Sequence, residues 1–393
     1  MNYILFDGPS REQLLPFTFT RPVADIRSGI LTLREKWEFL LGQETSSLSQ
    51  DYLSEKFPLK LESENILIDG SIVPNEALLA QVQNLEPGTA LVQHEKKLAV
   101  CVKADEVHEW EKLRFREIPV KESVTTINQV WDIYALNHQL ILQDFQWITR
   151  GRKSQPLSDS NFVQGDPSLI FLDEGAKVEF AFLNTNDGPI YIGKDAEVME
   201  GSKIRGPFAL CEHATVKMDA KIYTGTTIGP HSKVGGEISN SVIFGYSNKG
   251  HDGFLGNSVL GEWCNLGADT NISNLKNTYD MVKLWSYPEQ RFVNTGQQFC
   301  GLMMGDHSKT GINTMFNTGT VVGVSANIFG EGYPRNFIPS FSWGGKQGMS
   351  PYNLKKAFQV AEAVMARRDK AFDEVEKHIL NHIYEITFPK DKK

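Results

Sequence analysis

The fold is decided by the stretch Ile192–Val234, which reads in steps of six as IGKDAE VMEGSK IRGPFA LCEHAT VKMDAK IYTGTT IGPHSK V. Each step opens with an aliphatic residue: Ile192, Val198, Ile204, Leu210, Val216, Ile222, Ile228 and Val234. The fifth place of a step is small, except at Phe208, so the chain can turn a corner there. A unit this short cannot bury its aliphatic residue alone, so successive units stack around a shared core. The pattern predicts a parallel β-helix, because a run of independent short strands would need no fixed period.

The six-residue register returns twice after Val234. It continues first as Leu260, Leu266 and Ile272, and then as Met304, Thr310, Phe316, Val322 and Ile328. We therefore expect one solenoid over residues 160–345, interrupted by two long loops.

The flanking regions have different patterns. Residues 1–155 read as an α/β domain, with apolar strands at 2–6, 65–69 and 90–92 and helical character at 28–42. A polar segment at 152–160 is the expected linker. A C-terminal helix is predicted over 350–387, with Ser350 as its cap and Pro351 at its first position. Its apolar stripe predicts packing on the solenoid or on a partner subunit.

The composition excludes several classes of protein. The formal net charge is -8, and the basic residues are scattered, so neither nucleic acid nor an anionic membrane is expected as a partner. The four cysteines (Cys101, Cys211, Cys264 and Cys300) lie far apart without a CxxC pair, which predicts reduced thiols. No segment has the length or apolar character of a signal peptide or a membrane span, so a cytoplasmic location is expected.

The six-residue pattern resembles the hexapeptide acyltransferases. That resemblance implies a left-handed β-helix with triangular coils and a homotrimer with sites built between neighbouring solenoids.

A sharper resemblance comes from NKGHDGFLG (248–256) and NLGADTNISN (265–274). They resemble the acetyltransferase domain of the bifunctional N-acetylglucosamine-1-phosphate uridyltransferases, with its K-x-G-H-x-x-Y-x-G and N-x-G-A-G-T-x-x-x-N-Y motifs. The resemblance implies that His251 is the general base that takes a proton from an amino sugar phosphate as the amine attacks acetyl-CoA. Imidazole suits this role because it titrates near neutral pH. By the same resemblance Lys249, Phe254, Asn265 and Asn274 bind substrate.

The chain departs from these motifs in three places. Phe254 and Leu275 stand where the family has tyrosines, and Asp269 replaces a glycine. The identity of the acceptor sugar therefore stays open. His213, His231 and His307 fall within repeats and are expected to be surface residues.

The order of domains also matches those bifunctional enzymes, whose first domain joins a sugar 1-phosphate to a nucleoside triphosphate. Its usual L-A-A-G-x-G-T-R loop corresponds here to LFDGPSR (5–11), in which Pro9 removes one backbone donor. Gly8, Ser10 and Arg11 can still bind phosphate, and the nearest further cations are Arg21 and Arg27. Asp69, at the end of a predicted strand, resembles the aspartate that holds Mg²⁺ in this fold, although an Asp-Gly pair after a strand is also a common turn.

Together these resemblances imply a divergent bifunctional enzyme that acetylates an amino sugar 1-phosphate with acetyl-CoA and transfers a uridylyl or other nucleotidyl group with Mg²⁺. Two alternatives remain. In the first alternative only one of the two activities is retained, and the degenerate first loop favours loss of nucleotidyl transfer. Otherwise the protein is a silent scaffold that binds a sugar nucleotide.

Overall fold

A computed structural model describes residues 1–388, and contacts divide them into two compact units. The first unit comprises residues 1–14, 18–26 and 31–129, and the second comprises 15–17, 27–30 and the chain from Val130 onward. Helix α5 (Asn137–Thr149) thus belongs to the second unit, although the sequence pattern placed it in the first domain.

The first unit is a six-stranded mixed sheet in the order β2-β1-β3-β5-β4-β6. The strands are β1 (Asn2–Phe6), β2 (Ser46–Leu48), β3 (Glu64–Asp69), β4 (Thr89–Gln93), β5 (Lys96–Lys103) and β6 (Arg116–Pro119). Alternate residues of a strand face opposite sides. Leu5 and Ile68 therefore join one apolar cluster, and Phe6 and Leu67 join another. The predicted strands at 2–6, 65–69 and 90–92 are confirmed.

Three helices accompany this sheet: α1 (Ser10–Gln13), α2 (Leu33–Leu41) and α3 (Glu76–Gln83). Helix α2 starts at a capping box, in which the Thr32 hydroxyl accepts from the Glu35 amide and the Glu35 carboxylate accepts from the Thr32 amide. Trp37 of α2 and Leu78 of α3 lie in the same apolar cluster as Leu5, so these helices cover that face of the sheet.

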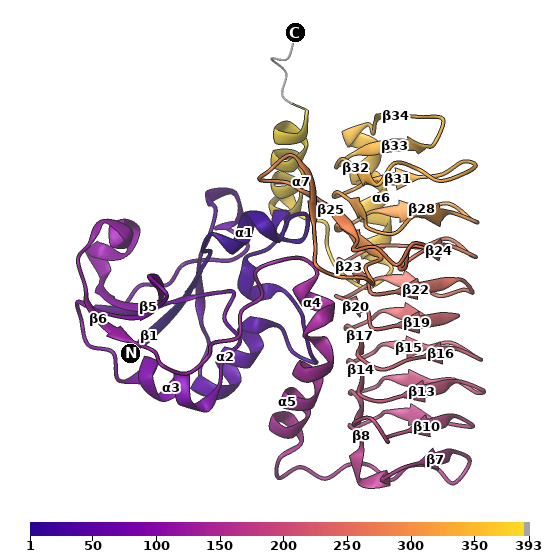
Figure 1. The fold of residues 1–393 in the computed structure, drawn as a ribbon, viewed down its shortest axis with the longest axis horizontal. Helices are drawn as coiled ribbons and strands as arrows, with labels where there is room; N and C mark the ends of the chain where they lie inside the picture. Colours follow the sequence, from indigo (N-terminus) through magenta and orange to yellow (C-terminus); the bar gives the residue numbers. More distant parts are fainter. Residues whose placement is uncertain (389–393) are drawn as a thin grey trace. The chain divides into compact units, whose positions relative to one another are not determined.

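The second unit is built on the predicted parallel β-helix (Figure 1). Every third strand pairs in parallel with its equivalent in the next coil, which gives three faces. The first face holds β7 (Phe162–Gln164), β10 (Phe182–Asn184), β13 (Lys203–Arg205), β16 (Lys221–Ile222), β19 (Glu237–Ser239) and β22 (Phe254–Gly256). The short pair β24 (Asn271–Ile272) and β29 (Met315–Phe316) is a separate sheet.

The other two faces follow the same scheme. The second face holds β8 (Ile170–Leu172), β11 (Ile190–Ile192), β14 (Phe208–Leu210), β17 (Thr226–Ile228), β20 (Val242–Ile243), β23 (Val259–Leu260), β27 (Leu302–Met304), β30 (Thr320–Val322) and β32 (Phe337–Ile338). The third face holds β9 (Lys177–Val178), β12 (Glu197–Val198), β15 (Thr215–Val216), β18 (Lys233–Val234) and β21 (Asn248–Lys249), and then β28 (Lys309–Thr310), β31 (Asn327–Ile328), β33 (Ser342–Gly345) and β34 (Gly348–Pro351).

The residues of the six-residue register fill the interior. The aliphatic residues quoted from Ile192 to Val234 are all buried in one cluster, together with Leu266, Phe316 and Ile328. Apolar surface removed from water contributes about 25 cal/mol per Å², so burial of this column stabilises the solenoid.

The interruptions differ from the expectation. The first is no long loop, because β21 and β22 continue the stack, and the corner before β19 is instead shortened. Val216 and Ile222 are six residues apart, whereas their partners in the next coil, Val234 and Ile238, are only four apart. The second interruption is a true insertion, which carries the antiparallel hairpin of β25 (Lys283–Ser286) and β26 (Arg291–Asn294).

Helices complete the second unit. Helices α4 (Asp132–Ala135) and α5 precede the solenoid in the chain (Figure 1). Ile141 of α5 lies in one apolar cluster with Phe171 and Tyr191 of the second face. The single C-terminal helix predicted over 350–387 was wrong in two respects. Ser350 and Pro351 pair in β34 and do not begin a helix. The helix is divided into α6 (Leu354–Ala366), capped by Asn353, and α7 (Glu374–Thr387), with the interrupting segment around Arg368 between them.

Candidate functional site

His251 lies at a corner of the solenoid, in the turn that leads from β21 on the third face to β22 on the first. Its side chain is exposed. The equivalent corner of the preceding coil is the shortened one, Gly235–Gly236, which packs directly against it. A Cβ on Gly236 would lie 2.9 Å from the carbonyl oxygen of His251, so the close approach of the two corners requires glycine there.

A cavity of about 860 Å³ opens beside this corner, between the third face and α6. His251 and Asn265 both line it. Its lining also includes five cationic side chains and no Asp or Glu among the described residues: Lys217, Lys233, Lys309, Arg367 and Arg368. Burial and the neighbouring charges of Arg368, Lys217 and Arg367 lower the pKa of Lys233, which shows how closely the positive charges gather. The cavity is suited to a ligand with several negative charges.

Lys249, predicted to bind substrate, has its side chain inside the solenoid and is not among the residues that line this cavity. The ammonium donates to the carbonyl oxygens of Gly235 (2.8 Å) and His251 (2.7 Å). Burial lowers the pKa of Lys249 to about 8, although Asp252 and Asp269 act in the opposite direction.

Phe254 and Asn274 lie elsewhere. The amide of Phe254, in β22 of the first face, donates to the Asn271 side chain, and the Asn274 amide group donates to the side chain of Asn257. Both flank Gly256, where a Cβ would come within 2.6 Å of each. Thus Asn265 shares a cavity with His251, whereas Phe254 and Asn274 form a separate pair beside Gly256.

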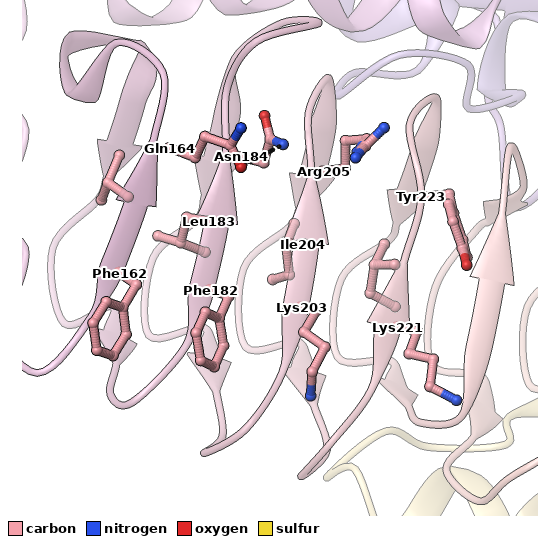
Figure 2. Close-up of a pocket in the computed structure, with 12 residues that line it drawn as sticks. Phe162, Gln164, Phe182, Leu183, Asn184, Lys203, Ile204, Arg205, Lys221 and Tyr223 are labelled. Carbon is pink, nitrogen blue, oxygen red and sulfur yellow. Dashed lines mark hydrogen bonds between the residues drawn. The ribbon is translucent and has the colours of Figure 1, made fainter.

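A second hollow, of about 530 Å³, lies on the outer side of the first face (Figure 2). Phe162 and Phe182 stack there with ring centroids 5.1 Å apart, and Lys203 and Lys221 continue their row (Figure 2). The parallel row is polar and ends in an aromatic residue: Gln164, Asn184, Arg205 and Tyr223. None of the residues predicted from the sequence to act in chemistry lies here.

The three histidines within the repeats differ in how far their side chains are exposed. His213, His231 and His307 occupy equivalent turns between the second and third faces, each with a φ near +60°, and they stack in one ladder with Tyr246 and Trp263. His213 is exposed, and His231 is partly buried. Burial and the charge of His213 lower the pKa of His231. The expectation of a surface residue was wrong for His307, which is buried at 7 % exposure.

In the first unit, the loop after β1 packs on the end of β3. A Cβ on Gly8 would lie 2.9 Å from Oδ2 of Asp69. The Ser10 hydroxyl is buried and has no hydrogen-bond partner among the described residues. Arg11 is already hydrogen-bonded within the unit, because its guanidinium donates to the Thr18 carbonyl (3.1 Å) and to the Tyr52 hydroxyl (2.8 Å). Gly8 therefore lies at the predicted strand end, Ser10 is buried in the helix that follows, and Arg11 is already hydrogen-bonded.

The two remaining predicted cations are both buried. Arg21 is 5 % exposed and belongs to the first unit. Arg27 belongs to the second unit, and its guanidinium donates to the carbonyl of Ile30.

Asp69 is fully buried and bonded within the chain. Its Oδ1 accepts from the amide (2.8 Å) and the hydroxyl (2.6 Å) of Ser71, and its Oδ2 lies 2.8 Å from the Lys96 ammonium. Residues 1–388 contain no group of three His, Cys, Asp or Glu side chains placed to hold a metal ion. The described residues therefore do not fit a resident metal, since a lysine already neutralises the predicted ligand, and we derive no step through one.

Sequence reasoning missed the cations from the C-terminal segment. Arg367 is the C-cap of α6 and Arg368 follows it, and only the fold brings them to the third face, where Arg368 donates to the Asn248 side chain at 3.4 Å. A signal was present, because Arg368 interrupts an otherwise apolar stripe. The four cysteines are free, as predicted, and all four are buried. No helix within residues 1–388 is long and apolar enough to cross a membrane.

Comparison with known proteins agrees with this architecture. The family model described as sugar nucleotidyl transferase matches residues 3–153. Residues 3–153 are therefore similar to sugar nucleotidyl transferases, and a parallel β-helix follows them in the chain.

Two curated relatives are named as bifunctional proteins. The bifunctional sugar-1-phosphate nucleotidylyltransferase/acetyltransferase of Sulfurisphaera tokodaii is 29% identical over 144 residues, which cover 36% of this chain and 35% of that protein. The bifunctional protein GlmU of Methanocaldococcus jannaschii is 32% identical over 118 residues, covering 30% and 26% of the two chains. The chain thus spans about a third or less of the length of these relatives. Over these matched parts the chain is similar to the two bifunctional proteins.

Among solved structures, the polysialic acid specific acetyltransferase NeuO is 16% identical and covers 50% of this chain and 88% of its own. Its TM-score is 0.27, which is too low to support an inference about this chain.

Proposed function

We propose that the protein is a sugar-phosphate transferase whose solenoid transfers an acetyl group from acetyl-CoA to an amino sugar 1-phosphate, with His251 as general base. One observation carries the proposal: a single cavity brings together the exposed His251 side chain, Asn265 and five cations without an opposing carboxylate. Coenzyme A has a diphosphate and a 3′-phosphate, and charge-assisted hydrogen bonds to such groups are among the strongest in proteins.

The chemistry assigned to each group follows from this arrangement. The His251 imidazole accepts a proton from the acceptor amine, whose nitrogen forms a bond to the thioester carbonyl carbon. The carbon–sulfur bond then breaks, and the departing thiolate takes the proton from the imidazolium. Asn265, exposed on the same wall, is placed to orient the acceptor or the acetyl group.

The resemblance further supports a homotrimer, since His251 stands at an exposed corner that a neighbouring solenoid can close. Light scattering tests this directly, and a monomer that is active in acetyl transfer would contradict it.

We propose nucleotidyl transfer as the second activity, on the match of residues 3–153 to sugar nucleotidyl transferases. Gly8 and the unpartnered hydroxyl of Ser10 beside Asp69 would contact the phosphates of a nucleoside triphosphate. Because the described residues do not fit a resident metal, magnesium would be supplied as the complex of the nucleoside triphosphate.

Product analysis tests both activities. The protein is incubated with acetyl-CoA and a panel of amino sugar 1-phosphates, and each acceptor is examined by mass spectrometry for a gain of one acetyl group. A parallel reaction with UTP, Mg²⁺ and N-acetylglucosamine 1-phosphate is assayed for pyrophosphate. Acetylated product without pyrophosphate would leave only the first activity, and the absence of both products would favour a sugar-nucleotide-binding scaffold.

A further inference from the structure

We propose that Lys249 is a positioning residue, which fixes the corner that carries His251 from inside the solenoid by donating to two main-chain carbonyl oxygens. This inference rests on the proposed acetyl transfer, and it gives Lys249 a role other than contact with substrate.

The first observation is the place of Lys249 in the core. Along the third face the inward position of successive coils is Val198, Val216, Val234 and then Lys249, and Val234 pairs directly with Lys249. Lys249 is 2 % exposed, so its methylene chain occupies the place of an aliphatic side chain. A buried ammonium is costly unless its donors are used, and an aliphatic residue would suffice if filling the column were its only task.

The second observation is the pair of hydrogen bonds that the Lys249 ammonium makes. It donates to the carbonyl of Gly235, in the corner below, and to the carbonyl of His251 in its own corner. The two corners are in contact here because the lower one is two residues short, which brings Gly236 close to His251 and Asp252. Lys249 therefore ties the backbone of the His251 corner to the preceding coil.

The consequence for the reaction is geometric. The carbonyl of His251 is held from inside, while its side chain reaches the cavity. Proton transfer requires the imidazole within hydrogen-bond reach of the amine, and a misplacement of about 1 Å can cost about a hundredfold in rate. Loss of the tie should thus lower kcat and leave the binding of acetyl-CoA, which the cations provide, largely unchanged.

Two substitutions separate hydrogen-bond donation from filling of the core. Lys249→Met keeps the length and apolar volume but removes all three donors, whereas Lys249→Gln retains two N–H donors without charge. We expect Lys249→Met to reduce kcat by about ten- to a hundredfold with KM for acetyl-CoA changed less than about twofold. Lys249→Gln should recover part of the loss. Val216→Ala perturbs the same apolar column two coils away and should keep kcat.

Amide hydrogen exchange supplies a readout that does not depend on activity. In Lys249→Met, exchange should accelerate at Gly250–Gly253 and remain unchanged in β15 and β18. Unchanged exchange at this corner, an unchanged kcat, or a Lys249→Gln variant no better than Lys249→Met would each overturn the inference. If the unaltered protein transfers no acetyl group, the proposed function fails, and the exchange result still decides whether Lys249 holds the corner.

Discussion

The burial of Lys249 predicts how the stability of the solenoid depends on pH. Burial lowers the pKa of this lysine from 10.5 to about 8. Between these values the unfolded chain binds more protons than the folded chain, so folding becomes more favourable as the pH rises. Below about pH 8 the ammonium is charged in both states, and this gain is absent. For pKa values of 8 and 10.5, the gain between pH 7 and pH 10 is about 2.5 kcal/mol.

The measurement compares the unaltered protein with Lys249→Met. Denaturant unfolding of both is followed by far-ultraviolet circular dichroism at pH 7 and pH 10, so that titrations common to both proteins cancel. The unaltered protein should gain about 2.5 kcal/mol relative to the variant at the higher pH. Lys203→Met, which changes a lysine that is 53% exposed on the first face, is the control and should show no such gain. If the difference in free energy of unfolding between the unaltered protein and Lys249→Met is the same at pH 7 and pH 10, the buried position of this ammonium is refuted.

Two further predictions concern the solenoid. Gly229→Ala should prevent folding of the β-helix, because the new Cβ would lie 1.2 Å from the carbonyl oxygen of Phe244. Gly250→Ala is the control and should fold, because no atom lies within 4 Å of its new Cβ. Equal solubility and equal circular dichroism of the two variants would contradict this packing. Replacing Arg367 and Arg368 together by alanine should raise KM for acetyl-CoA by at least about a hundredfold, because two charge-assisted hydrogen bonds of about 1.5 kcal/mol or more each are lost and about 1.4 kcal/mol is a factor of ten. An unchanged KM in steady-state assays would remove these arginines from the binding site.

The β-helix was predictable from the sequence because its period is local. Each aliphatic residue from Ile192 to Val234 reports on the same kind of position, so eight matches reinforce one another. The shortened corner at Gly235–Gly236 was not recognised, because a deletion of two residues looks the same in sequence as the end of the repeat.

The site was predictable only in part, for a physical reason. His251 was found through its motif, but a motif does not show which way a neighbouring side chain points. Lys249 belongs to the inward column, so it faces the core although it is only two residues from His251. Arg367 and Arg368 come from the far end of the chain, and only tertiary packing brings them to the cavity. Likewise, the Lys96 that neutralises Asp69 lies on β5 and is adjacent only in the folded sheet.

The central claim is that acetyl transfer occurs at His251, and release of coenzyme A tests it most directly. Thiol release from acetyl-CoA is measured with glucosamine 1-phosphate as acceptor for the unaltered protein, His251→Ala and His213→Ala. His213 is an exposed histidine of the same solenoid that does not line the cavity, so its replacement controls for the loss of a surface imidazole. We predict that His251→Ala loses at least about a hundredfold in kcat, the usual contribution of a general base, while His213→Ala keeps the rate. Equal rates for all three proteins would contradict the assignment of His251 as the base.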